Sequence, residues 1–140
     1  MTTVFTRIID GELPGTFVWR DERCVGFLSI NPLARGHVLV VPIEPVDHWI
    51  DAEPELLAHL FEVTRVIGVA QRAAFDCARV GVIIAGYEVP HAHIHVIPTT
   101  RMAELSFENA AVSVDPDDLA AAGEAIRTEL TGLGRSEVST

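Results

Sequence analysis

Three histidines alternate along one short segment of the chain. His91, His93 and His95 are separated by single apolar residues within the segment 90–98. Alternate residues of a β-strand point to the same side of a sheet, so an extended segment presents all three imidazoles on one face. Burying three imidazoles without partners costs free energy, and a simple core face would carry Val or Ile instead. The pattern therefore indicates a functional site.

Three interpretations fit this row of imidazoles. The first is a set of solvent-facing polar residues, although Ser, Thr or Lys would serve that purpose equally well. The second is a metal site, because neutral imidazole binds zinc. However, the row from His91 to His95 spans about 13 Å in a strand, so one ion would need a curled strand or a further ligand such as His37. The third is nucleophilic attack on phosphorus by His93, since imidazole is substantially neutral at pH 7.

The elements that must hold this row mix strands and helices. Strands are expected at residues 17–20, 24–30, 37–42, 80–84 and 91–98, and a short helix or turn at 4–9. A long helix is expected from Pro54, because apolar residues recur there near the 3.6-residue period. A second helix is expected to begin after a capping Asp115 and to end before Gly132. This order predicts an α+β fold with a mainly antiparallel five-stranded sheet, one long helix and a C-terminal helix.

The charge of the chain limits the partners that it can have. The 140 residues include 20 acidic and 10 basic side chains, for a net charge of −10, and every basic residue is Arg. A basic face is needed to hold a nucleic-acid polymer or an anionic membrane surface, so neither is expected as a partner. A small anionic ligand needs only a few local donors. No apolar run approaches the ~18–20 residues that cross a bilayer.

The cysteines and the chain length indicate a cytoplasmic domain. Cys24 and Cys77 lie far apart and outside any CxxC motif, which favours a reducing, cytoplasmic location with buried, inert thiols and no metal-thiolate site. The remaining histidines, His48 and His59, are expected on the solvated surface. We expect a single domain over residues 1–133, followed by a disordered tail at 134–140.

The alternating histidines and their surroundings resemble the histidine triad (HIT) family, whose signature is HxHxH with apolar spacers. The resemblance is strongest over residues 4–102. The segments Val4–Ile9, Glu22–Cys24, Phe27–Pro32 and Gly36–Pro42 follow in the family's order and spacing. The resemblance implies the HIT-like fold, a small-molecule nucleotide as ligand, no cofactor, and a homodimer in which two half-sheets join into one.

The resemblance also implies a role for each histidine. His93 resembles the nucleophile that forms a nucleotidyl-histidine intermediate, His91 would orient it, and His95 would contact the phosphate and the leaving group. His37 resembles a fourth histidine on a neighbouring strand. The implied reaction is hydrolysis or transfer at the α-phosphate of a nucleoside monophosphate derivative, either a phosphoramidate or a dinucleoside polyphosphate. The apolar sleeve that holds the base would comprise Val4, Phe5, Ile8, Phe27, Leu28 and Ile30.

Several positions depart from the family's pattern. Ser29 stands where an Asp usually holds the ribose hydroxyls, and it gives up a charge-assisted contact. Glu88 stands where branches with nucleotide phosphoramidase activity carry a Ser or Thr, and its carboxylate would repel a phosphate unless it were protonated or paired, for example with Arg101. The family's occasional zinc site is missing, because there is no N-terminal CxxC and Pro45 replaces a histidine.

These departures leave two alternatives open. The first is a non-catalytic nucleotide-binding or sensing module, which Ser29, Glu88 and the absence of the Asn that the family often carries in the loop before the triad would favour. The second is a metal-dependent hydrolase that uses the histidine row.

Overall fold

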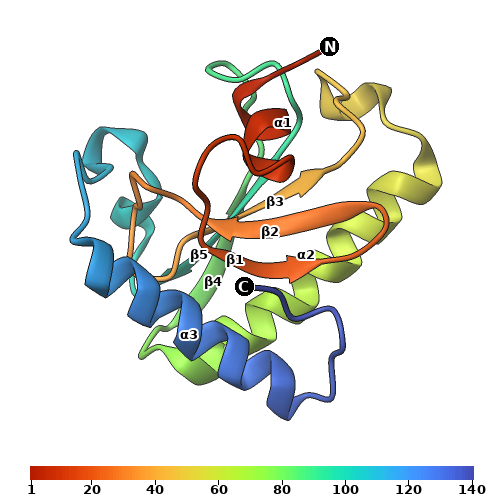
Figure 1. Cartoon of the computed structure of the whole chain (residues 1–140). Helices are drawn as coiled ribbons and strands as arrows, with labels where there is room; N and C mark the ends of the chain where they lie inside the picture. Colours follow the sequence, from red (N-terminus) through yellow and green to blue (C-terminus); the bar gives the residue numbers. More distant parts are fainter.

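A five-stranded antiparallel sheet forms the centre of the protein (Figure 1), and its strands follow the order β1-β2-β3-β5-β4. The structure is a computed structural model that describes residues 1–140. The strands are β1 (Phe17–Arg20), β2 (Cys24–Leu28), β3 (Val38–Pro42), β4 (Arg79–Ile83) and β5 (Ile94–Thr99). Every neighbouring pair is antiparallel. The expected α+β class and five-stranded sheet are therefore confirmed.

Three α-helices accompany the sheet: α1 (Val4–Ile9), α2 (Pro54–Ala74) and α3 (Pro116–Gly132). Proline stands in the first turn of both α2 and α3, where its missing N–H costs no helical hydrogen bond. Asp115 caps α3 by accepting a hydrogen bond from the Asp117 N–H at 2.8 Å. Short 3₁₀ turns lie at Trp49–Asp51, Met102–Leu105 and Phe107–Asn109. No helix has an apolar stretch long enough to cross a membrane.

The two faces of the sheet carry separate apolar cores. On one face, side chains such as Val40 and Val96 pack against Ile67 of α2 and Ile126 of α3. On the other face, a smaller cluster joins Phe5 of α1 to Phe27 of β2 and its neighbours. Figure 1 shows α2 and α3 together on one side of the sheet and α1 on the other. The smaller core is the one that lies beside the histidines.

Two strand boundaries differ from the expectation near the site. β5 begins at Ile94 rather than at residue 91, because the preceding backbone bonds to a loop instead of a strand: the Ala92 N–H donates to the Val46 carbonyl at 2.7 Å. β2 ends at Leu28 rather than at Ile30. Of the alternating histidines, only His95 therefore lies within a paired strand, opposite Leu39 of β3.

The C-terminal residues are ordered against β1, contrary to the disordered tail that we expected for 134–140. The Arg20 N–H donates to the Glu137 carbonyl at 2.8 Å, and Val138 forms a bridge with Trp19. The Arg135 guanidinium lies 5.1 Å from the centre of the Trp19 ring. The tail covers the outer edge of β1, a strand that otherwise has a partner on one side only.

A buried glutamine of α2 holds together the two segments that carry His37 and His95. Gln71 Nε2 donates to the carbonyls of Gly36 and Val96, both at 2.9 Å. Gly36 has a positive φ of 88°, and a Cβ there would collide with the ring of Phe75. Glycine is therefore required directly before His37, where the chain turns into β3.

Candidate active site

His93 presents an unprotonated ring nitrogen. Its Nδ1 lies 2.7 Å from the backbone carbonyl of His91, which can only accept, so Nδ1 carries the proton and donates it. The other nitrogen, Nε2, keeps its lone pair. His93 is 7% exposed, and this burial lowers its pKa below the ordinary value. A neutral imidazole with a free Nε2 has the properties of a nucleophile.

His91 is fully buried and fixed from both sides. Its Nε2 donates to the Pro42 carbonyl at 2.7 Å. Its Nδ1 must therefore accept, and the Thr3 hydroxyl donates to it at 2.8 Å. Burial lowers the pKa of His91, so the ring stays neutral. The position of the His91 carbonyl, and with it the tautomer of His93, depends on this arrangement.

Thr3 is available for this bond because it also begins α1. Its hydroxyl accepts from the Thr6 N–H at 3.1 Å, and the Thr6 hydroxyl accepts from the Thr3 N–H at 3.3 Å. This reciprocal capping box fixes the first turn of the helix. The Thr3 hydroxyl accepts within the cap and donates to His91, so the start of α1 is tied to the histidine segment.

The second pair of histidines forms a chain that starts at a backbone amide. The Leu33 N–H donates to His37 Nδ1 at 3.0 Å, so the His37 proton is on Nε2. That Nε2–H donates to His95 Nδ1 at 2.9 Å. Consequently His95 carries its own proton on Nε2, the nitrogen that is not bonded to His37. His95 thus has an N–H that can meet a phosphate oxygen or a leaving group.

Burial keeps this pair neutral. Desolvation, together with the charge that His95 and His93 would add if protonated, lowers the pKa of His37 to about 3. Desolvation and the charge of a protonated His93 lower the pKa of His95 to about 4. The rings of His93 and His95 have their centres 4.9 Å apart in an edge-to-face arrangement. A ring with a free lone pair and a ring with a free N–H are therefore neighbours.

Only part of the apolar sleeve expected for the base lies together beside His93. The ring centre of Phe5 lies 4.9 Å from that of His93 and 5.6 Å from that of Phe27, and Ile8 packs against the same cluster. Val4 and Ile30 have exposed side chains. Leu28 belongs to the core on the α2 side, because successive residues of β2 point to opposite faces. The structure thus places Leu28 away from Phe5 and Phe27.

The two altered positions lie at the margins of the site. The Ser29 N–H donates to the His37 carbonyl at 2.9 Å, and its hydroxyl accepts from the Asn31 N–H at 3.2 Å. Glu88 is exposed, and its negative charge acts on His93 by raising that pKa, a smaller effect than burial. No ion pair joins Glu88 to Arg101.

Three contributors to this site could not be predicted from the sequence. The Thr3 hydroxyl donates to His91, and the Leu33 N–H sets the tautomer of His37. The ring of Phe107 lies 5.0 Å from that of His95, edge to face. Each of these contacts is formed either by tertiary packing or within a turn. The residue spacing of a strand or a helix therefore could not predict it.

Of the two histidines expected on the surface, His48 is exposed. His59 differs, because its Nε2 is hydrogen-bonded to Asp21 at 2.7 Å.

Comparison with known proteins agrees with this geometry. The sequence profile of the HIT domain matches residues 10–102, a range that includes all four site histidines. A HIT-like protein of Methanocaldococcus jannaschii is 34% identical over 99 residues, which cover 68% of this chain and 77% of the relative. The crystal structure of a hypothetical histidine triad nucleotide-binding protein from Sulfolobus tokodaii superposes with a TM-score of 0.83 at 26% identity, covering 94% of each chain. A HIT family hydrolase from Legionella pneumophila superposes with a TM-score of 0.61 at 28% identity, covering 72% of this chain and 96% of the other. The chain therefore belongs to the histidine triad family.

Proposed function

We propose that the protein is a nucleotide hydrolase or transferase that acts at the α-phosphate of a nucleoside monophosphate derivative through a nucleotidyl-histidine intermediate. The observation that carries this proposal is the pairing of His93 and His95. One offers a free Nε2 lone pair and the other an Nε2–H, and their ring centres are 4.9 Å apart. Nucleophilic displacement at phosphorus needs one group of each kind.

The reaction balances with these two side chains and solvent. His93 Nε2 attacks the α-phosphorus, the N–P bond forms, and the bond from phosphorus to the leaving group breaks. The His95 Nε2–H donates a hydrogen bond to the departing group: a phosphate or nucleotide leaves as the anion, and an amine takes its proton from solvent. In the second step water attacks phosphorus and loses a proton to solvent, and the N–P bond breaks to release the nucleoside monophosphate. His91 and His37 act by holding the two reacting rings.

Binding of the nucleotide would use the apolar cluster and the end of β2. The rings of Phe5 and Phe27 supply an apolar surface beside His93 for a base. The Ser29 hydroxyl is the group available for the ribose. The names of two structural relatives, a nucleotide-binding protein and a hydrolase, support this assignment. We place the activity in the cytoplasm, since Cys24 and Cys77 are both unpaired.

An experiment with a substrate labelled at phosphorus distinguishes the proposed mechanism from its alternatives. Adenosine 5′-phosphoramidate, labelled at phosphorus, is incubated with the protein and quenched under conditions that preserve phosphoramidates. The wild type is expected to release labelled AMP and to carry acid-labile label, whereas His93→Asn should do neither. Nucleotide binding without turnover or label would instead indicate a sensing module. Turnover that leaves no label, stops with a chelator and returns with zinc would indicate a metal-dependent hydrolase.

The exposed edge of the sheet supports a homodimer. β4 is the last strand in the sheet order, and none of its five residues is fully buried although its sequence, RVGVI, is largely apolar. The other strands are almost entirely buried. An exposed apolar edge is the place where a second copy can add its own strand. Val82, the fourth residue of this strand, is 44% exposed.

Sedimentation equilibrium tests this assembly. The wild type should sediment as a dimer, and Val82→Arg should shift it toward the monomer by placing a charge at the shared edge. Val112→Arg is the matched control, because Val112 is 94% exposed and lies outside every strand. A monomeric wild type would contradict the dimer and leave the catalytic proposal intact.

A further inference from the structure

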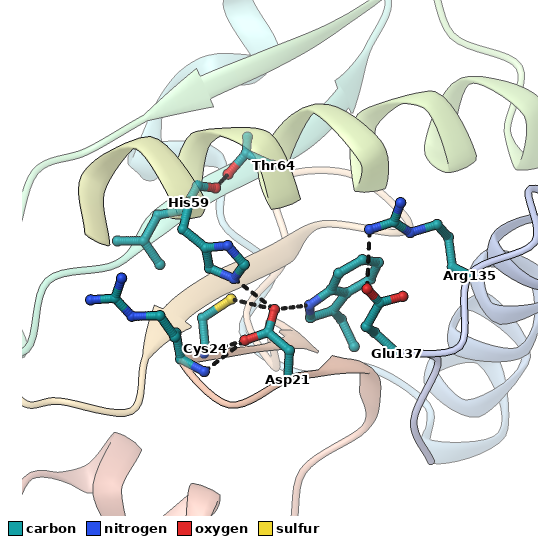
Figure 2. A network of polar contacts seen from close by, with 9 residues as sticks. Asp21, Cys24, His59, Thr64, Arg135 and Glu137 are labelled. Atoms are coloured by element: carbon teal, nitrogen blue, oxygen red, sulfur yellow. Dashed lines mark hydrogen bonds and ion pairs between the residues drawn. The ribbon is translucent and has the colours of Figure 1, made fainter. Parts of the chain in front are cut away.

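A second group of polar side chains lies where the turn between β1 and β2 meets α2 (Figure 2). It comprises Asp21 of the turn, Cys24 at the start of β2 and His59 of α2. The Asp21 Oδ2 lies 2.7 Å from His59 Nε2 and 3.6 Å from Cys24 Sγ. The three potential ligand atoms all lie within 4.8 Å of one another. None of the three residues is hydrogen-bonded to a histidine of the active site.

The carboxylate of Asp21 is held in place before any ligand arrives. Its Oδ1 accepts from the backbone N–H groups of Arg23 at 2.7 Å and Cys24 at 2.9 Å. Its Oδ2 accepts from the Trp19 indole N–H at 2.8 Å. These three hydrogen bonds fix the carboxylate in place, and Oδ2 is the oxygen that faces Cys24 and His59.

We propose that Asp21 Oδ2, Cys24 Sγ and His59 Nε2 form a binding site for a divalent cation of the zinc type, with water as a fourth ligand. Zinc prefers tetrahedral sites built from thiolate, imidazole and carboxylate. The thiolate and the carboxylate together carry two negative charges, which neutralise a divalent ion in this half-buried place. Trp19 would remain hydrogen-bonded to the carboxylate and orient it from outside the ligand shell.

An ion at the site would replace two of the hydrogen-bond contacts of Asp21. Asp21 Oδ2 is approached by the S–H of Cys24 and by the ring nitrogen of His59. A cation replaces both contacts: the thiol gives its proton to solvent, and the neutral imidazole coordinates through Nε2 with its proton on Nδ1. Binding therefore releases the thiol proton.

The position of the site determines how an ion would reach it and which elements the ion would join. Cys24 is fully buried, whereas the side chain of His59 is 35% exposed, so water and the ion approach from the α2 side. Residues 21 and 24 belong to the hairpin and residue 59 to α2, so a bound ion would cross-link two elements. An Asp–His hydrogen bond alone would join the hairpin to the helix. The sulfur atom beside that pair adds the soft donor that distinguishes a metal site from a structural hydrogen bond.

Cobalt titration of the reduced protein tests the proposal. Co²⁺ reports sulfur ligation through a thiolate-to-metal charge-transfer band, which imidazoles of the active site cannot produce. The wild type should bind a single equivalent with this band and lose the cobalt to Zn²⁺. Cys77→Ser, which removes the other thiol, should behave like the wild type. Cys24→Ser should lose the band, and His59→Gln should weaken binding by about tenfold or more.

Each result decides the question. Absence of the band in the wild type at saturating Co²⁺ would overturn the proposal, as would a band that survives in Cys24→Ser or an affinity unchanged in His59→Gln. Circular dichroism of each variant shows that it is folded. Because His59 is half-exposed, His59→Gln provides a test even where replacement of the buried thiol disturbs the hairpin. Zn²⁺ should also raise the melting temperature of the wild type and of Cys77→Ser, with no such rise in Cys24→Ser.

Discussion

Each proton on the four active-site histidines is assigned by a partner that can play only one role. The carbonyls of Pro42 and His91 can only accept, and the Leu33 N–H can only donate. From these backbone groups the tautomers follow one after another. Two hydrogen-bond chains run into the site, and they end in complementary groups: a lone pair on His93 and an N–H on His95. Since all four rings are kept neutral by burial, the arrangement holds near pH 7.

Removal of the Thr3 hydroxyl tests the first of these chains. Thr3→Val leaves His91 Nδ1 buried without a donor, a loss of about 1–3 kcal/mol. The His91 segment should then hold His93 less well, and we expect kcat with an AMP-amidate to fall about tenfold while KM stays within about twofold. Thr3→Ser should restore kcat. Thr6→Val, which weakens the helix cap but keeps the bond to His91, is the control for the cap alone. An unchanged kcat in Thr3→Val would show that the hydroxyl has no positioning role.

The carboxylate of Glu88 should weaken the binding of an anionic substrate. Glu88 is exposed and its charge acts on His93, where the phosphate would lie. Glu88→Gln should therefore lower KM for the nucleotide by about threefold, the size expected for an exposed charge contact. Added salt should reduce the difference between the wild type and the variant, because the repulsion is screened. A KM that rises on substitution would mean that Glu88 donates or positions rather than repels.

At the scale of elements, the sequence predicted what depends on local order. The start of α2 at Pro54 and the cap of α3 at Asp115 are read from neighbouring residues, and both are confirmed. The predicted start of β5 was wrong, because the Ala92 N–H is hydrogen-bonded to the carbonyl of Val46 in a loop rather than to a strand. The cluster of Asp21, Cys24 and His59 was not foreseen, since only the packing of α2 on the hairpin brings it together.

The C-terminal tail shows the same limitation. The segment 134–140 is short and largely polar, which favours disorder. It nevertheless pairs with β1 and covers Trp19. The packing partner lies more than a hundred residues away in the sequence. No local pattern in the tail could indicate that the edge of β1 was open to it.

Truncation after Leu133 tests the contribution of the tail. The change removes the backbone bonds to β1, the Val138 contact and the Arg135 guanidinium over the Trp19 ring. We expect a loss of about 2 kcal/mol in the free energy of unfolding, measured by urea denaturation, and a red shift of tryptophan fluorescence as Trp19 becomes exposed. Glu137→Gln breaks the ion pair with Arg135 but keeps the backbone pairing, so it should cost no more than about 0.5 kcal/mol. Equal stability of the truncated chain and the wild type would contradict this role.

At the scale of the whole molecule, an acidic protein presents a neutral site. The net charge of −10 disfavours long polyanions, whereas the site would meet the proposed nucleotide with imidazoles that burial keeps uncharged. The smaller core under α1 supplies both the apolar surface for a base and the low-polarity surroundings of the histidines. The same burial that prepares the site therefore makes the stability of the fold depend on pH.

Stability should decrease as the pH falls from about 6.5 toward 4. The pKa of His37 is lowered to about 3 and that of His95 to about 4, against 6.5 for both in the unfolded chain. In this window the unfolded state binds more protons than the folded state, so the free energy of unfolding drops with pH, by at most ~1.4 kcal/mol per pH unit for each histidine. Asp21, with its pKa lowered from 3.8 to about 2, adds a further loss of stability only below this window.

Urea denaturation at several pH values between 7 and 4.5 measures how steeply the free energy of unfolding depends on pH. His37→Gln should be less stable at pH 7 but show a shallower slope, because one of the buried rings with a lowered pKa is gone. His48→Gln, at an exposed position, should retain the slope of the wild type. A slope that is the same in His37→Gln and His48→Gln would mean that the buried pair does not govern the acid sensitivity of the fold.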